Sequence, residues 1–179
     1  GFPHFGISLA LCLDEQPVLG WIFDPCKNEL FTAISGEGTF LNGNEIAVSG
    51  TDSLERSLIA TGFPYKVNEH KDNNLIEFCA FRLKCQGLRR FGAAALDLAY
   101  VAAGRLDGFW ERWLKPWDTA AGILMIQEAG GIVTRFDRSD YSIFHTDIVA
   151  SNPGIHSQMT EVLNSSLPEL PDISLSGQK

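Results

Sequence analysis

Short apolar runs alternate with turn signals along the first fifty residues. The runs show partial alternation of apolar and polar positions, which is typical of strands, and they cover residues 5–13, 18–23 and 29–34. Asn42-Gly43 supplies the two positive φ angles that a type I′ hairpin turn requires. Short connections of this kind join neighbouring antiparallel strands. The pattern predicts that residues 1–50 form an antiparallel meander.

The pattern changes after Asp52, where strands and helices alternate. Apolar runs predict strands at 57–61, 88–91, 106–110, 132–136 and 148–150, and helical spacing predicts helices at 74–84, 93–103, 118–129 and 153–163. Gly104 and Gly130 follow two of these helices, at the position where a left-handed cap is expected. Residues 51–163 therefore form a predicted α/β part. Residues 164–179 have no period and are expected to be a frayed tail.

Composition and charge exclude some partners. The 179 residues carry 22 acidic and 14 basic side chains, so the net charge of −8 repels a phosphate backbone and no nucleic-acid partner is expected. No apolar run reaches the length of a bilayer span, so no membrane partner is expected either. The four cysteines lack C-x-x-C spacing and two lie among apolar neighbours, which predicts buried, reduced thiols and a cytoplasmic location.

The segment 110–122 is the strongest candidate for chemistry. Pro116 biases Lys115 toward an extended conformation, and Asp118 is then the expected N-cap of the helix 118–129. A helix N-terminus attracts anions such as phosphate, and a carboxylate beside it is suited to a divalent cation that holds phosphate oxygens. Asp118 is thus interpreted either as a plain cap or as a metal ligand.

Two further positions lie at junctions between strands and helices. Glu111 follows the predicted strand 106–110 and is either a ligand-binding carboxylate or a solvated charge beside Arg112. Gly92, Ala93 and Ala94 precede the next predicted helix, where small residues let a ligand approach backbone N–H groups or let a helix pack closely on a sheet.

The sequence WDTAAG at 117–122, followed by EAGG at 128–131, resembles the W-D-x-A-A-G…E-A-G-G signature of the inositol monophosphatase family. The segment 95–111 is similar to bacterial-type inositol-1-monophosphatases. Further matches are GFPHF at 1–5, DP at 24–25, GEG at 36–38, NG at 42–43 and VASN at 149–152. The resemblance therefore extends over nearly all of the chain up to about Leu163.

This resemblance implies a Mg²⁺-dependent, lithium-sensitive phosphatase with a layered α/β/α/β/α sandwich fold, usually a homodimer. Its substrates are small phosphorylated polyols or sugars. Inositol monophosphate is the default, and relatives accept histidinol phosphate, fructose bisphosphate or phosphoadenosine phosphate. By the same resemblance Asp118 binds the metal and the substrate hydroxyl, Glu111 contacts the substrate alcohol, and Gly92, Ala93 and Ala94 line the substrate pocket. Ala93 departs from the family pattern because it lacks the hydroxyl of Ser or Thr.

A second departure concerns the family's D-P-[IL]-D-G-T loop, which supplies most of the metal ligands and is absent from this sequence. The chain resembles the carboxy-terminal two-thirds of such an enzyme, and Asp118 alone cannot hold the two or three cations that metal-activated hydrolysis needs. One hypothesis, favoured by Gly1 in place of Met, is that the natural protein is a complete phosphatase. The other is a short, non-catalytic relative that acts as a binding or regulatory protein.

Overall fold

The computed structural model describes residues 1–64 and 72–165, which form two five-stranded sheets. The first sheet is an antiparallel meander whose strands lie in sequence order: β1 (Ile7–Leu13), β2 (Gln16–Asp24), β3 (Glu29–Ile34), β4 (Gly38–Leu41) and β5 (Asn44–Glu45). This confirms the predicted meander. The hairpin turn between β4 and β5 has φ of 49° at Asn42 and 81° at Gly43, as the Asn-Gly pair requires.

The second sheet is mixed and has the order β7-β6-β8-β10-β9. Its strands are β6 (Leu58–Thr61), β7 (Gly87–Arg89), β8 (Gly108–Arg112), β9 (Ile132–Thr134) and β10 (Asp147–Ser151). Strand β6 pairs in parallel with β7 and β8, whereas β10 pairs antiparallel with β8 and β9. Strand β8 therefore lies at the centre of the sheet, so that side chains near its end are enclosed by neighbours on both sides.

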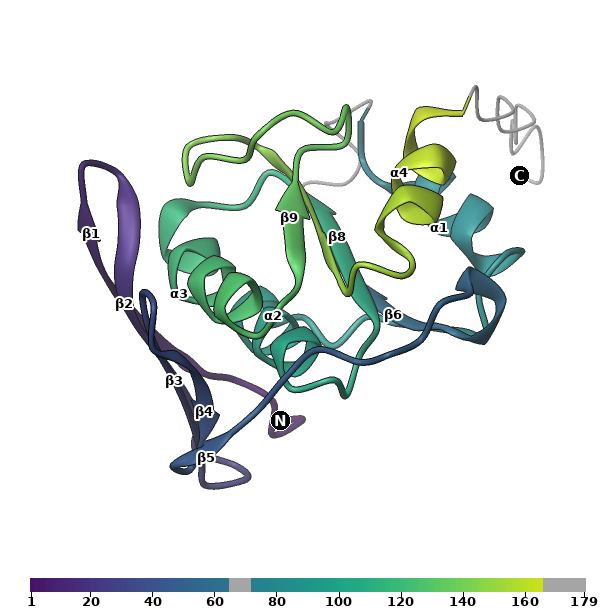
Figure 1. Cartoon of the computed structure of the whole chain (residues 1–179). Helices are drawn as coiled ribbons and strands as arrows, with labels where there is room; N and C mark the ends of the chain where they lie inside the picture. Colours follow the sequence, from purple (N-terminus) through teal and green to yellow (C-terminus); the bar gives the residue numbers. More distant parts are fainter. Residues whose placement is uncertain (65–71, 166–179) are drawn as a thin grey trace, which may run out of the picture.

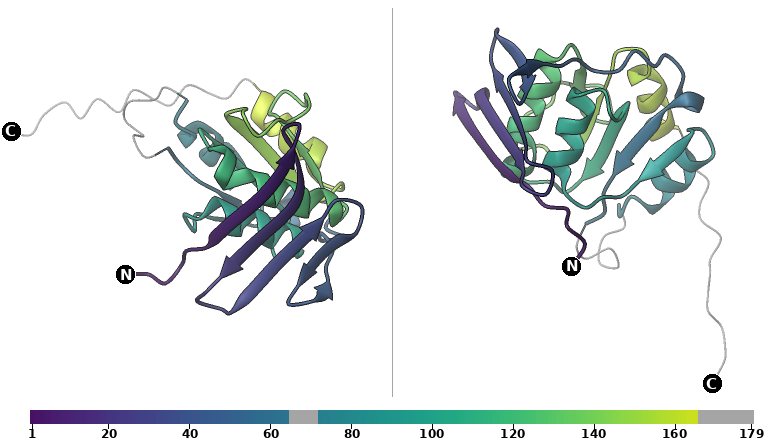
Figure 2. Two further views of the ribbon diagram at one scale, coloured as in Figure 1. Left: turned by 90° about the vertical axis from the view of Figure 1, so that its left-hand side faces the viewer. Right: turned by 90° about the horizontal axis from the view of Figure 1, so that it is seen from below.

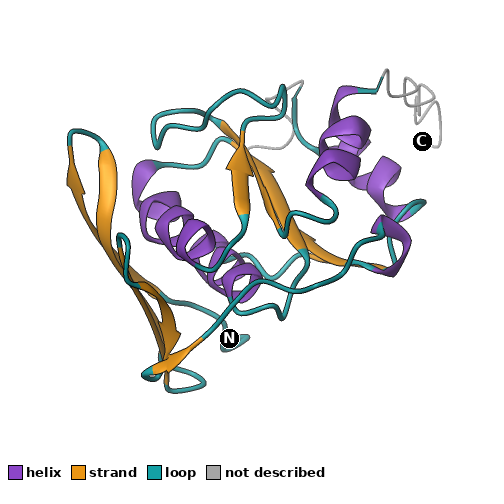
Figure 3. Ribbon diagram, viewed as in Figure 1, coloured by secondary structure: helices purple, strands orange, loops and turns teal. Residues whose placement is uncertain are grey.

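Four α-helices complete the fold: α1 (Leu75–Arg82), α2 (Ala94–Ala102), α3 (Pro116–Glu128) and α4 (His156–Asn164), with a short 3₁₀ helix, η1 (Leu54–Arg56), before β6. Figures 1 and 3 show α2 and α3 between the two sheets, with α1 and α4 on the far side of the second sheet. The described residues thus form β, α, β and α layers in succession. These layers agree with the predicted sandwich, apart from an outer helical layer on the first sheet, which residues 1–64 and 72–165 do not contain.

Small residues in α3 permit close packing on both sides of the helix. A Cβ atom at Gly122 would lie 2.5 Å from Cβ of Leu98 in α2, and a Cβ atom at Gly20 in β2 would lie 3.2 Å from Cα of Ala121. Ala120 and Ala121 are buried. The Ala-Ala-Gly part of the motif therefore lets α3 approach both α2 and the first sheet.

The outward face of the first sheet is apolar. Alternate residues of β1 are 49–63% exposed: Ile7, Leu9, Leu11 and Leu13. They stand opposite residues of β2 such as Phe23 and Trp21, in register with Ile7 and Leu9. The left view of Figure 2 shows this sheet facing the viewer. No other described element covers this face.

Some predicted details were wrong. The last helix begins at His156 and not at Pro153, because residues 153–155 form a turn held by the Asn152 side chain. All four cysteines are free, yet only Cys85 is buried, and Cys26 and Cys79 are exposed on a turn and on a helix face. Asn164, predicted as the first residue of the frayed tail, is instead the last residue of α4, and the part of the predicted tail from residue 166 onward lies outside the described residues. Among the helices of residues 1–64 and 72–165, none is long and apolar enough to cross a membrane.

Candidate active site

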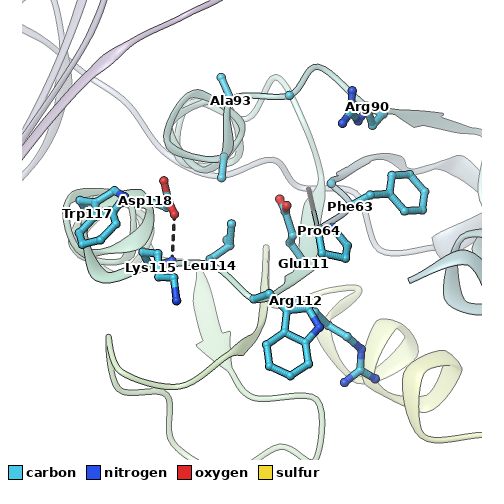
Figure 4. Close-up of a pocket in the computed structure, with 14 residues that line it drawn as sticks. Phe63, Pro64, Arg90, Ala93, Glu111, Arg112, Leu114, Lys115, Trp117 and Asp118 are labelled. Carbon is cyan, nitrogen blue, oxygen red and sulfur yellow. Dashed lines mark hydrogen bonds between the residues drawn. The ribbon is translucent and has the colours of Figure 1, made fainter. Parts of the chain in front are cut away.

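A pocket of about 560 Å³ opens where four chain segments meet, two from the second sheet and two from the starts of helices α2 and α3. Its walls come from the end of β6, the residues before α2, the end of β8 with its following loop, and the start of α3 (Figure 4). The site residues predicted from the sequence all line it: Gly92, Ala93, Ala94, Glu111 and Asp118. The structure therefore brings together residues separated by up to 26 positions in the chain.

Asp118 does not occupy the predicted N-cap position. Helix α3 begins at Pro116, and Lys115 is the N-cap, with the extended backbone (φ −110°, ψ 160°) that a following proline favours. Asp118 is the third helical residue. Its Oδ2 accepts a hydrogen bond of 2.9 Å from the Lys115 N–H, and its own N–H donates to the Lys115 carbonyl oxygen. The carboxylate thus stabilises the helix start from within the first turn, as in a capping box.

Asp118 also faces the pocket. Figure 4 shows the carboxyl groups of Asp118 and Glu111 on opposite sides of the space beneath Ala93. Among the described residues, no hydrogen bond to Oδ1 of Asp118 is formed, so this oxygen is available to a ligand. The capping role and a ligand-binding role are therefore compatible in this geometry.

Glu111 lies within β8 and is not at the strand end that the sequence predicted, because β8 runs on to Arg112 through antiparallel pairing with β10. The side chain is 8% exposed, which contradicts the solvated alternative. The pKa of Glu111 is raised to about 8, chiefly by burial and also by the negative charges of Asp97 and Asp118, against the opposing charge of the Arg90 guanidinium. Glu111 is thus a buried carboxyl group whose nearest charged influences are two other acids and Arg90.

Asp97 and Arg90 were not among the residues predicted for the site. Asp97 lies in the first turn of α2 and is 1% exposed, and its Oδ1 has no hydrogen-bond partner among residues 1–64 and 72–165. Burial raises the pKa of Asp97 to about 8, against the charge of Arg90, which lines the pocket. In the sequence, Asp97 stands out as a single acid among the apolar residues of its predicted helix. An acid at such a position is seldom buried without a role.

The amino-terminal ends of α2 and α3 both open on this pocket. Ala94 is the first residue of α2, Ala93 precedes it, and Gly92 has a φ of 89°, which glycine adopts without strain. Helix N-termini carry partial positive charge and free N–H donors. A small anion therefore finds favourable positions beside α2 and α3, between carboxyl groups that suit a cation.

A complete cation site is not formed by the described residues. Residues 1–64 and 72–165 contain no group of three or more His, Cys, Asp or Glu side chains placed to share a metal ion. Mg²⁺ needs six ligands in octahedral geometry, with one or two carboxylates typically among them. Asp118 offers one carboxylate with an oxygen open to the pocket, and the described residues bring no group of three such side chains together around it.

The layered sheets and helices, with a pocket that holds two carboxyl groups at two helix N-termini, define an α/β protein with a pocket suited to a small charged ligand. The chain belongs to the inositol monophosphatase family, whose sequence profile matches residues 1–171. The solved structure of inositol monophosphatase from Anabaena (Nostoc) sp. PCC 7120 superimposes with a TM-score of 0.91 at 44% identity, covering 94% of this chain and 67% of that one. The fold predicted from the sequence is confirmed.

Two further relatives have a comparable sequence identity to this chain. The inositol-1-monophosphatase of Synechocystis sp. is 44% identical over 162 residues, which is 90% of this chain and 56% of that protein. The Nus factor SuhB of Escherichia coli is 41% identical over 167 residues, which is 93% of this chain and 62% of that protein. The chain thus spans about three-fifths of the length of these relatives.

Proposed function

We propose that the natural full-length protein is a Mg²⁺-dependent phosphatase that hydrolyses small phosphate monoesters, with inositol monophosphate as its most favoured substrate. The observation that supports this most is the position of Asp118 and Glu111 on one pocket, at the N-termini of α2 and α3. Helix N-termini stabilise the phosphate, and the two carboxyl groups serve a cation and a substrate hydroxyl.

Each predicted residue has a role in this proposal. Asp118 is one ligand of the metal through its free oxygen, and it also accepts a hydrogen bond from a substrate hydroxyl. Mg²⁺, when bound, would activate a water molecule and neutralise charge on the phosphate, with its other ligands supplied from outside the described residues. Glu111 binds the substrate alcohol. Gly92, Ala93 and Ala94 contact the substrate through their backbone, because Ala93 has no hydroxyl to donate.

The size of the pocket supports a small substrate. A volume of about 560 Å³ lies within the range of small-molecule sites and accommodates a phosphorylated polyol or sugar. Histidinol phosphate, fructose bisphosphate and phosphoadenosine phosphate are alternative substrates within the same fold. Hydroxyl placement and charge distinguish these compounds, so relative kcat/KM values across the four rank them.

A non-catalytic role is the competing proposal. One relative carries the name Nus factor SuhB, which does not name a phosphatase reaction. Phosphate release by the natural full-length protein with Mg²⁺, measured against each of these substrates, tests the choice. Turnover that disappears on chelation with EDTA supports the phosphatase. If the protein turned over none of these phosphate monoesters, the phosphatase proposal would be contradicted and the binding or regulatory role favoured.

The remaining family properties are part of the same proposal: a cytoplasmic homodimer that Li⁺ inhibits. The four unpaired cysteines are compatible with a reducing compartment. Light scattering of the full-length protein tests the dimer, and phosphate release in the presence of LiCl tests the inhibition.

A further inference from the structure

Gly62 is packed directly against the carboxyl group of Glu111. A Cβ atom built at Gly62 would lie 2.2 Å from Oε1 of Glu111 and 2.3 Å from its Cδ and Oε2. These distances are far shorter than any real contact, so the carboxyl group occupies the volume that a side chain at position 62 would need. The φ of Gly62 is not in the left-handed region, and the requirement for glycine here is one of space.

The backbone at Gly62 is held in place by a buried asparagine. The Nδ2 of Asn74, which is fully buried, donates hydrogen bonds of 2.7 Å to the Gly62 carbonyl oxygen and to Oγ1 of Thr61. The Oδ1 of Asn74 accepts a bond of 2.6 Å from Nε1 of Trp110. Asn74 therefore ties the end of β6 to the residue that precedes Glu111 in β8.

A second connection fixes the same two strands. Thr61 is in parallel register with Trp110, and the Thr61 hydroxyl donates a bond of 2.7 Å to the Trp110 carbonyl oxygen. Trp110 is itself fully buried and stacks on Phe81, with ring centroids 4.0 Å apart. Satisfied buried networks of this kind are rigid. The Gly62 backbone is thus a fixed surface beside a flexible carboxyl-bearing side chain.

We propose that Gly62 is a positioning residue for Glu111: its side-chain-free backbone, anchored by Asn74, sets where the Glu111 carboxyl group lies in the pocket. This inference rests on the proposed function, in which that carboxyl group binds the substrate alcohol. A methyl group at position 62 displaces the end of the Glu111 side chain and leaves the anchored backbone where it is. The fold is kept, and the substrate contact is lost.

The substitution Gly62→Ala in the natural full-length protein tests this. Gly50→Ala is the matched control, since Gly50 has open space around its Cβ position and no positive φ. Misplacement by about an ångström costs up to about 100-fold in rate, so we expect Gly62→Ala to lower kcat/KM by about 10–100-fold. In a Glu111→Ala background the carboxyl group is absent, and Gly62→Ala should cause no further loss. Gly50→Ala should leave kcat/KM unchanged in both backgrounds.

A second readout does not depend on activity. The Glu111 carboxyl carbon is followed by ¹³C NMR across the pH range, with its signal assigned by its absence in Glu111→Gln. Displacement of the carboxyl group toward solvent should move its pKa from about 8 toward the ordinary value of a glutamate, and Gly50→Ala should not move it.

The two measurements also separate the two proposals. If the unsubstituted protein releases no phosphate, the proposed phosphatase function fails, and the Glu111 titration alone decides whether Gly62 positions that side chain. An unchanged Glu111 titration in Gly62→Ala overturns the positioning role. An equal loss of kcat/KM with and without Glu111 overturns it as well.

Discussion

The carboxylate of Glu128, the last residue of α3, accepts a hydrogen bond of 3.0 Å from the N–H of Gly38 at the start of β4. Its other oxygen accepts a bond of 2.9 Å from the N–H of Gly36 in the preceding turn. A negative charge at a helix C-terminus opposes the helix dipole, so this position is favourable only because the turn supplies two donors. Two short motifs that are far apart in the sequence, Gly-Glu-Gly and Glu-Ala-Gly-Gly, are thus one structural connection between the first sheet and α3.

Glu128→Ala should therefore lower stability without acting on the pocket. Two hydrogen bonds to a charged, half-buried acceptor predict a loss of about 1–2 kcal/mol in the free energy of unfolding, measured by urea denaturation. Glu37→Ala, in the same turn but with an exposed side chain, is the matched control and should change stability by less than about 0.5 kcal/mol. Equal effects of the two substitutions would contradict the proposed connection.

Features fixed by local chemistry were predicted from the sequence. The strand 29–34 coincides with β3, and Gly104 and Gly130 have the expected positive φ angles of 66° and 81°. The bounds of a strand and the φ angles of cap glycines depend on turn residues and on the spacing of apolar residues, and both are set by a few neighbouring positions. The start of α3 was wrong by two residues, because an aspartate near a helix start is favourable both at the N-cap and at the third position, and Pro116 permits either.

Relationships between distant strands could not be predicted in the same way. The pocket residues Asp118, Glu111 and 92–94 were predicted from their places at junctions and from the family motif, and the structure places them together. Gly62, in contrast, precedes Phe63-Pro64 and looks like an ordinary turn glycine. Its contact with Glu111 exists only because β6 and β8, 49 positions apart at Thr61 and Trp110, pair in parallel.

Asp118→Asn separates the two roles of this residue. An asparagine Oδ1 still accepts the hydrogen bond from the Lys115 N–H but carries no charge for a cation. In the natural full-length protein we expect phosphate release to fall at least about 100-fold, as when a group that stabilises transition-state charge is lost. The free energy of unfolding should change by less than about 0.5 kcal/mol.

Asp118→Ala is the companion variant, because it removes the hydrogen bond as well and should cost about 1 kcal/mol in stability. Urea denaturation and a phosphate-release assay on both variants give the comparison. If Asp118→Asn reduced stability and activity to a similar extent, Asp118 would be a structural residue of the α3 start and nothing more.

The buried acids predict that the free energy of unfolding falls as pH rises toward about 8. Burial raises the pKa of both Glu111 and Asp97 to about 8, well above their values in an unfolded chain. Near neutral pH the folded state therefore binds more protons than the unfolded state, and this contribution to stability is lost as pH rises through about 8. The two carboxyl groups interact and titrate as a pair.

Urea denaturation in EDTA should show the free energy of unfolding falling by about 1–2 kcal/mol per group between pH 6.5 and 8.5. His156, whose pKa burial lowers to about 4, adds a small opposing slope near pH 6.5, where the unfolded residue is about half protonated, and none once the pH is well above that value. Glu111→Gln should decline less steeply than the unsubstituted protein. If the free energy of unfolding stayed level or rose between pH 6.5 and 8.5, burial would not be raising the pKa of either acid.

The apolar outer face of the first sheet predicts self-association of the 179-residue chain when it is studied by itself. Ile7, Leu9, Leu11 and Leu13 are 49–63% exposed, and β1 is also the edge strand of its sheet, with no further strand beside it in the described part of the chain. The double variant Leu9→Lys/Leu11→Lys should reduce association, measured by sedimentation velocity over a range of concentrations. Leu83→Lys is the control, since Leu83 is 88% exposed on another part of the surface and should leave association unchanged. A chain that remains a monodisperse monomer at high concentration would show that this face tolerates water, because nothing else in the described residues shields it.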